Sequence, residues 1–402
     1  MSQTREKSVL PTDALVARAR ELVIGGGQVH KRGLNIPGYP RFAVRGKGVR
    51  FWDDQGRQFI DYLCAFGPIL LGYGHPKVDA AVKKQVDEGS IFNLPHPLEA
   101  DLAEELTRLI PCAEMVSYFT GGSGATTGAV AMARAYTGRE KIVQCGYHGW
   151  HDWAQPQRRY VPAPVKSLTF PLGYANLEDA REIFREHGAE IACLIIEPIT
   201  SNLPSPEYFL ELKAICEQHG ALFILDEIKT GLRLAMGGAQ EYLGVTPHLA
   251  TFGKAMANGY DIGVLVGRKD IMASCEDVWL AATFHGHLLG IVAALATIEE
   301  MKAIDGVSVI WAQGRKLMSG LENIVGRYGV DARCVGLPPM PHLKFSQEAE
   351  QIGRRFWEGT AKRGIYLSPT HVWFISPAHD DAVIEETLGA ADEAMAEAVG
   401  PG

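Results

Sequence analysis

Short hydrophobic runs alternate with longer amphipathic stretches through the middle of the chain, from about residue 115 to about residue 300. The short runs have the composition of buried strands, and the longer stretches repeat their hydrophobic positions with the period of a helix. We place strands at 116–119, 141–145, 192–196, 221–225, 249–252 and 262–266. Strands that are separated by helix-length segments predict βαβ units, and therefore a mainly parallel sheet covered by helices on both faces.

The two ends of the chain show a less regular order of strands and helices. Near the N-terminus we predict a helix over 12–24 and a pair of antiparallel strands joined by a turn at 54–56. A long alanine-rich helix at 288–304 leads out of the parallel region. Beyond it, the expected elements are strands that begin at Arg333, His342 and Val372 and helices over 349–362 and 380–398.

This pattern divides the chain into three parts. Residues 1–75 are an N-terminal segment that contributes to a small domain, residues 76–305 are a large α/β domain, and residues 306–402 are the small α+β domain. We find no internal repeat.

Composition and charge exclude several classes of protein. The chain of 402 residues has a net charge of −8, which argues against a general binder of polyanions such as nucleic acids. Its seven cysteines are dispersed without metal-binding spacing, as expected of free thiols in a reducing compartment. We find neither a signal peptide nor an apolar segment long enough to cross a membrane, and we expect a cytoplasmic protein.

Lys254 stands in the apolar segment 250–259, between Phe252 and Met256. Burial disfavours the ammonium form of a lysine, so Lys254 can be neutral and attack a carbonyl group. The alternative is a lysine whose stem only covers apolar surface. The preceding strand favours the first reading, because it ends in Asp226 at the edge where open α/β sheets bind ligands. Pyridoxal phosphate (PLP) requires this pair: the lysine forms the Schiff base, and the aspartate keeps the pyridine nitrogen protonated.

A glycine-rich turn at 121–124 joins the strand 116–119 to an alanine-rich helix. The N–H groups at such a helix start, together with the Ser123 hydroxyl, can bind a phosphate group. A turn that only permits tight packing is the alternative.

The loop 146–153 concentrates aromatic and imidazole side chains after the strand 141–145. One of these aromatic rings could stack on a planar cofactor. His148, His151 and Asp152 could instead suggest a metal site, but the third-ligand spacing of zinc families is missing, and we place metal binding well below ring stacking.

Taken in order, these motifs resemble those of class III aminotransferases in the fold-type I PLP-dependent superfamily, most closely the glutamate-1-semialdehyde 2,1-aminomutase-like branch. The resemblance extends from Gly25 to about His379. The matching segments are 51–56, 60–62, 67–68, 71–76, 121–126, 147–152, 197–198, 226–233 and 253–254. The resemblance implies a large domain with a mainly parallel seven-stranded sheet between helices. It also implies a small α+β domain built from the N- and C-terminal segments.

The resemblance implies roles for individual residues as well. Lys254 would form the internal aldimine and Asp226 would pair with the pyridine nitrogen. The further cofactor contacts that it implies are Gly122, Ser123 and Gly124 at the phosphate, Tyr147 on the ring, Asn202 near the ring hydroxyl, and Thr283. Thr283 would reach the phosphate bound in the partner subunit, so the resemblance implies a homodimer. It implies no metal.

On the substrate side the sequence departs from the aminomutase branch. Arg32 matches the arginine that this branch directs at the substrate carboxylate, but Val29 stands where the branch has a serine. Phe66 and His285 also replace other residues of the branch pattern. The candidate substrate contacts are Arg32, Phe66, His148 and His285. We therefore expect the cofactor chemistry of the family with a substrate other than glutamate-1-semialdehyde.

The predicted activity is amino transfer through the internal aldimine and pyridoxamine phosphate. The donor would be an amino acid, and the acceptor an aldehyde or ketone of a polar metabolite such as an oxidised sugar, an aminocyclitol or another secondary metabolite. An aminomutase is the second reading and a racemase or epimerase the third. A binding module would need neither Lys254 nor Asp226. A nicotinamide-dependent oxidoreductase would need an acid where the next strand ends in Cys145-Gly146.

Overall fold

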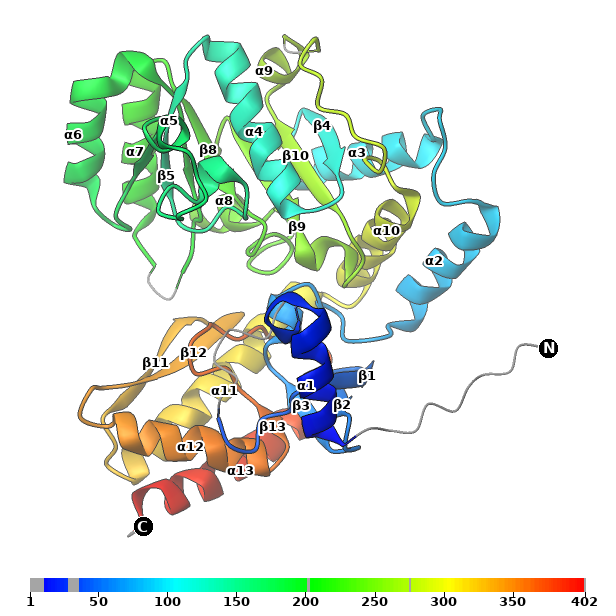
Figure 1. Ribbon diagram of the computed structural model, residues 1–402, viewed down its shortest axis with the longest axis vertical. Coiled ribbons are helices and arrows are strands. Elements are labelled where there is room, and N and C mark those ends of the chain that lie inside the picture. Colours follow the sequence, from blue (N-terminus) through cyan, green and yellow to red (C-terminus); the bar gives the residue numbers. More distant parts are fainter. Residues whose placement is uncertain (1–10, 28–35, 201–202, 275, 401–402) are drawn as a thin grey trace.

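The computed structural model describes residues 11–27, 36–200, 203–274 and 276–400. In this part of the chain, a large sheet with surrounding helices lies above a smaller region of short sheets and helices (Figure 1). The seven strands of the large sheet are β4 (Met115–Phe119), β5 (Lys141–Cys145), β6 (Thr169–Pro171), β7 (Ile191–Ile196), β8 (Leu222–Asp226), β9 (Leu249–Gly253) and β10 (Gly263–Gly267). The predicted α/β class with a seven-stranded, mainly parallel sheet is confirmed.

The large sheet has the strand order β4-β10-β9-β8-β7-β5-β6. Strand β10 pairs antiparallel with both β4 and β9, whereas the other pairs are parallel. Every residue of β7 and β8 is buried, and so is every residue of β9 and β10. Strands covered on both faces need no polar alternation, which explains their continuous apolar runs.

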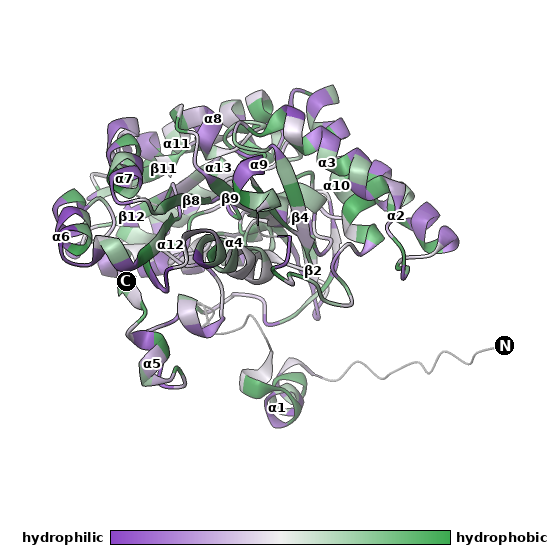
Figure 2. Ribbon diagram, turned by 90° about the horizontal axis from the view of Figure 1, so that it is seen from above, coloured by the Kyte–Doolittle hydropathy of each residue, from purple (hydrophilic) through white to green (hydrophobic). Residues whose placement is uncertain are grey.

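Helices of the large region connect and cover these strands. They are α2 (Pro76–Glu88), α3 (Pro97–Leu109), α4 (Gly122–Thr137), α5 (Ala163–Lys166), α6 (Leu177–His187), α7 (Pro206–Gln218), α8 (Ala239–Leu243), α9 (Lys269–Ala273) and α10 (Leu288–Ala303). Helices α2, α3 and α6 have both hydrophilic and hydrophobic residues, as Figure 2 shows. An amphipathic helix of this kind buries its apolar face and leaves its polar face in water.

The smaller region combines segments from both ends of the chain. Its strands are β1 (Ala43–Lys47), β2 (Arg50–Asp53), β3 (Gln58–Asp61), β11 (Ala332–Leu337), β12 (Met340–Phe345) and β13 (Ile365–Tyr366). Its helices are α1 (Thr12–Leu22), α11 (Gly306–Arg327), α12 (Glu350–Lys362) and α13 (Asp381–Val399). Strand β13 pairs parallel with β3, so one sheet contains strands from both terminal segments. The boundaries at residues 75 and 305 stay predictions.

Three details differ from the sequence-based expectation. The segment 372–376 is not a strand, because its backbone N–H groups bond in turn to Pro341, Tyr62 and Pro339 instead of to one neighbouring strand. Strand β6 has only three residues and ends in Pro171, so it gives no recognisable pattern of hydrophobic positions. Helix α11 was also not predicted.

Candidate active site

The carboxyl ends of four neighbouring parallel strands, β5, β7, β8 and β9, meet at one edge of the large sheet. The loops that follow these strands, together with the start of α4, enclose a cavity of about 240 Å³. Its lining residues are Gly122, Ser123, Thr126, Tyr147, His148, Gly149, Glu197, Asp226, Ile228, Lys229 and Lys254. Six residues that the sequence singled out therefore share one cavity: Gly122, Ser123, Tyr147, His148, Asp226 and Lys254.

Lys254 follows Gly253, the last residue of β9. Its φ angle of 44° lies in the left-handed region, which side-chain-bearing residues adopt at a cost and which often marks a functional position. Burial and then the positive charge of Lys229 lower the pKa of Lys254 to about 8, although Glu197 and Asp226 act in the opposite direction. A substantial fraction of the Lys254 amine is therefore neutral, and nucleophilic, near neutral pH.

Asp226, the last residue of β8, is only 3% exposed. Its Oδ2 atom lies 2.7 Å from Nδ1 of His148, and its Oδ1 atom accepts the Ile228 N–H at 3.1 Å. These two contacts hold the Asp226 carboxyl group in a fixed position at the end of the strand.

His148 has protein partners on both ring nitrogens. Nδ1 contacts Asp226, and Nε2 lies 3.1 Å from the Cys145 carbonyl oxygen. These two contacts fix the orientation of the His148 ring beside Asp226. The substrate contact expected of His148 stays a prediction, and His148 lines the cavity.

Helix α4 begins beside the cavity at Gly122, and the residue before it, Gly121, offers no side-chain cap. The first N–H groups of a helix lack partners within the helix and attract anions. Gly122 and Ser123 line the cavity, whereas the N–H of Gly124 donates to the Gly121 carbonyl at 3.1 Å and Gly124 is not among the lining residues. Two of the three predicted phosphate contacts therefore border the cavity.

The loop after β5 approaches the start of α4 too closely for a side chain. A Cβ atom on Gly149 would lie 2.3 Å from Oγ of Ser123, and Gly149 has a φ of +108°. The Thr126 hydroxyl donates to the His148 carbonyl at 2.7 Å and joins the two segments. Thr126 also lines the cavity.

Glu197, which follows β7, connects two other lining residues. Its Oε1 atom lies 3.0 Å from Nζ of Lys229, and its Oε2 atom accepts the Tyr147 N–H at 3.0 Å. Burial raises the pKa of Glu197, but Lys229, His148 and the Tyr147 N–H outweigh it, so the pKa lies below its ordinary value. Tyr147 is 51% exposed and lies at the cavity wall.

Besides Gly124, three predicted contacts within the described residues do not line the cavity. Phe66 packs edge to face against His371, with ring centroids 5.3 Å apart. Thr283 is exposed, and His285 lies 3.0 Å from the Leu280 carbonyl through Nδ1. Within one chain these residues do not contribute to the cavity wall.

Two further predicted contacts, Arg32 and Asn202, lie outside the described residues.

Arg233 links the loop after β8 to the small region. It is fully buried, and its two terminal nitrogens donate to the carbonyls of Ile375 at 2.9 Å and Gly67 at 2.7 Å. These contacts anchor the loop after β8 to the small region.

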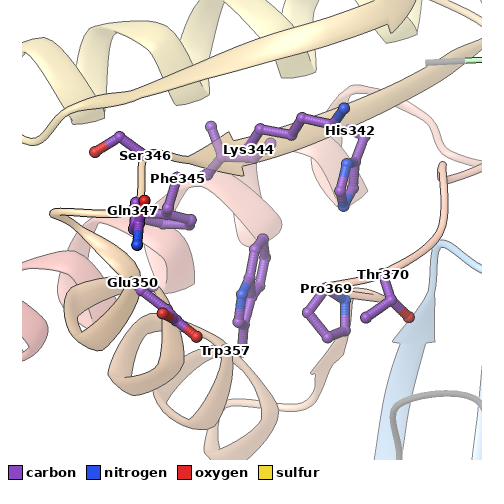
Figure 3. A pocket seen from close by; sticks show the side chains of 11 residues that line it. His342, Lys344, Phe345, Ser346, Gln347, Glu350, Trp357, Pro369 and Thr370 are labelled. Carbon is purple, nitrogen blue, oxygen red and sulfur yellow. The ribbon is translucent and has the colours of Figure 1, made fainter.

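A different hollow, of about 390 Å³, lies in the small region between β12, α12 and the segment around Pro369 (Figure 3). His342, Lys344 and Trp357 are among its lining residues. It contains none of the predicted cofactor or substrate contacts, so it does not compete with the cavity at the edge of the large sheet.

Five lining residues were not predicted as cofactor or substrate contacts: Thr126, Gly149, Glu197, Ile228 and Lys229. Lys229 stands three positions after Asp226, inside the motif that the resemblance used. Its charge at the end of a buried strand was the signal that could have identified it. Thr126 has no comparable signal, because threonines are common in the first turns of helices.

Two kinds of feature are absent from the described part of the chain. There, no group of three or more His, Cys, Asp and Glu side chains is placed to hold a metal ion. In the same part, none of the helices is long and apolar enough to span a membrane.

Comparison with known proteins identifies relatives over almost the whole chain. The model of the class-III aminotransferase family matches residues 35–388. A 3-aminobutyryl-CoA aminotransferase of Cloacimonas acidaminovorans (strain Evry) is 37% identical over 96% of both chains. The FumI protein of Sphingopyxis sp. MTA144, solved in its PLP internal aldimine form, is 29% identical. Its TM-score is 0.91, over 96% of this chain and 95% of the other.

The aminomutase branch is more distant than the sequence motifs suggested. A glutamate-1-semialdehyde aminomutase from Pseudomonas aeruginosa PAO1 superimposes with a TM-score of 0.85, over 96% of this chain and 94% of the other, but shares only 18% identity. That likeness shows the fold alone. Because the family match spans most of the chain, the chain belongs to the class-III aminotransferases and is a PLP-dependent transaminase.

Proposed function

We propose that the cavity at the edge of the large sheet holds PLP, with Lys254 as its covalent partner. The observation that supports this most strongly is the meeting of Lys254, Asp226 and the start of α4 around one cavity. The uncapped helix start suits a phosphate group, and Asp226 suits a protonated ring nitrogen. Gly149 approaches Ser123 closely and narrows the part of the cavity beside the start of α4, which suits a site that fits one phosphate group.

PLP, when bound, supplies an aldehyde that bonds to amines and a ring that withdraws electrons from the substrate carbon. The residues of this chain would position the reacting groups and move the proton. Lys254, once displaced by the amino donor, takes the proton from the substrate carbon at Nζ and returns it. His148 holds Asp226 at 2.7 Å, and Asp226 would then be positioned to pair with the ring nitrogen.

The pKa of Lys254 gives a testable pH dependence. Only the neutral amine has a lone pair for bonding to an aldehyde, and its fraction increases as the pH rises through about 8. The rate constant for covalent capture of PLP by the apoprotein, followed by stopped-flow absorbance, should rise about tenfold per pH unit below this value and level off above it. A rate that continues to rise to about pH 10, as for an ordinary lysine, would contradict this assignment.

We further propose that the substrate pair includes a β-amino acyl thioester of the 3-aminobutyryl-CoA type and its keto counterpart. The support is the relative that bears this name, at 37% identity over 96% of both chains. The polar aldehydes and ketones expected from the sequence, and the aminomutase reaction, are the alternatives.

A panel of substrates tests this proposal. The protein with bound PLP is mixed separately with 3-aminobutyryl-CoA, free 3-aminobutyrate, glutamate-1-semialdehyde and an amino sugar, and the loss of the visible band of the cofactor is timed. We expect 3-aminobutyryl-CoA to give the highest kcat/KM. A higher kcat/KM with the amino sugar or with glutamate-1-semialdehyde would contradict the thioester proposal and would assign that other substrate class to the protein.

The active form is proposed to be a homodimer in which Thr283 reaches the phosphate site of the partner subunit. Helix α1 has no buried residue and projects from the rest of the chain (Figure 2), to which Thr12 at its start is hydrogen-bonded through Asp54 and Gln55. Leu22 and Ile24 are 69% and 92% exposed, and Phe92, Leu94 and Phe284 are also exposed. Exposed apolar side chains in such number are typical of an interface between chains.

A further inference from the structure

Two lysines, Lys229 and Lys254, line the cavity. The aldehyde of PLP can react with any neutral primary amine, so a cavity with two amines needs a means of choosing one. The covalent step joins the amine nitrogen to the carbonyl carbon, and the carbonyl oxygen leaves as water. An ammonium group has no lone pair and cannot begin this step.

The two amines differ in their partners. Nζ of Lys229 lies 3.0 Å from Oε1 of Glu197, and both side chains are largely buried, at 12% and 15% exposure. The side chain of Lys254 makes neither a hydrogen bond nor an ion pair with any residue in the described part of the chain. A buried ion pair stabilises the charged form of a lysine, whereas burial without a partner favours the neutral form.

Glu197 is held in the position that this pairing requires. Its Oε2 atom accepts the Tyr147 N–H at 3.0 Å, which leaves Oε1 directed at Lys229. A Cβ atom on Gly146 would lie 2.8 Å from Oε2, so the absence of a side chain there allows the carboxylate to approach the loop.

We propose that Glu197 holds Lys229 as an ammonium group, so that of these two lysines only Lys254 bonds covalently to PLP. This inference rests on the proposed function of the cavity. Lys229 is then a positioning residue, and its charge has a second effect. Four charged groups face Lys254. Lys229 and Arg233 oppose protonation of the Lys254 amine, whereas Glu197 and Asp226 favour it.

The test locates the lysine that captures PLP. The wild-type protein and Glu197→Gln are incubated with PLP near pH 7.5, reduced with borohydride and digested, and the labelled lysine is identified by mass spectrometry. In the wild type, the label should be on Lys254. In Glu197→Gln, a buried Lys229 without its counter-charge becomes neutral more easily, and its share of the label should rise about tenfold or more.

A matched control is Glu190→Gln. Glu190 pairs with Lys141 at 2.9 Å, outside the cavity. This variant should leave all of the label on Lys254, and the double variant Glu197→Gln/Lys229→Gln should return the label to Lys254.

The outcomes separate the two proposals. If Glu197→Gln and the wild type both carry the label on Lys254 alone, the role of Glu197 is refuted while the proposed function stands. If the wild type carries its label on another lysine, the proposed function itself fails.

A second variant decides the matter if Glu197→Gln does not fold. In Lys229→Gln, the amide can still donate to Glu197, but the positive charge is lost. The pH midpoint of PLP capture by the apoprotein should rise, and capture near pH 7 should slow severalfold, by up to about tenfold per unit of the rise. An unchanged midpoint would show that Lys229 is uncharged in the wild type and would overturn the inference.

Discussion

Replacement of Lys254 by alanine is expected to abolish covalent attachment of PLP and to lower the rate of amino transfer by roughly three orders of magnitude or more. The reason is that Lys254 would supply both the nucleophilic nitrogen and the group that moves the proton. Lys229, held by Glu197 at 3.0 Å, does not substitute for it. The measurement is borohydride reduction followed by intact-protein mass spectrometry, together with the steady-state rate.

Lys344→Ala is the control for this loss. Lys344 lines the separate hollow of the small region and should be replaceable without effect on PLP attachment. Lys254→Ala protein that is folded and still shows the mass increase of reduced PLP would disprove the assignment of Lys254.

Asp226→Asn should lower kcat by about two to four orders of magnitude while the protein remains folded. The amide has nearly the shape of the carboxylate but no charge, so it cannot favour a protonated ring nitrogen. It also offers His148 an altered hydrogen-bond partner at the position that is now 2.7 Å away. Rates of the two half-reactions, measured in single-turnover experiments, separate this loss from weaker binding of PLP.

The comparison variant for Asp226→Asn is Asp270→Asn, which removes an exposed carboxylate outside the cavity. It should leave kcat within about twofold, as is usual for surface positions. If Asp226→Asn also changed kcat by no more than about twofold, the proposed pairing of Asp226 with the ring nitrogen would be wrong.

The sequence predicted best those residues whose place in the fold follows from a local pattern, such as the end of a strand or the start of a helix. Apolar runs predicted strands β4 to β10 apart from the short β6. The polar residues that end β8 and follow β9, Asp226 and Lys254, lie together because parallel strands share one edge. The glycine-rich turn before α4 likewise placed Gly122 and Ser123 at the same cavity.

Contacts between distant segments could not be predicted in this way. The partner of His148 is Asp226, 78 positions away, and no pattern within the loop 146–153 indicates that pairing. The segment 372–376 is buried and apolar like a strand, but its backbone bonds to residues on two different neighbours. Phe66 and His285 were chosen as differences from a branch that proved distant, at 18% identity, and the cavity does not include them.

The cavity between the ends of β5, β7, β8 and β9 is proposed to bind PLP through Lys254. A crystal structure of the protein grown with PLP tests it most directly. We expect continuous density from Nζ of Lys254 to the cofactor, the phosphate at Gly122 and Ser123, and the ring nitrogen facing Asp226. Cofactor joined to a different lysine, or bound in the hollow lined by His342 and Trp357, would contradict the account.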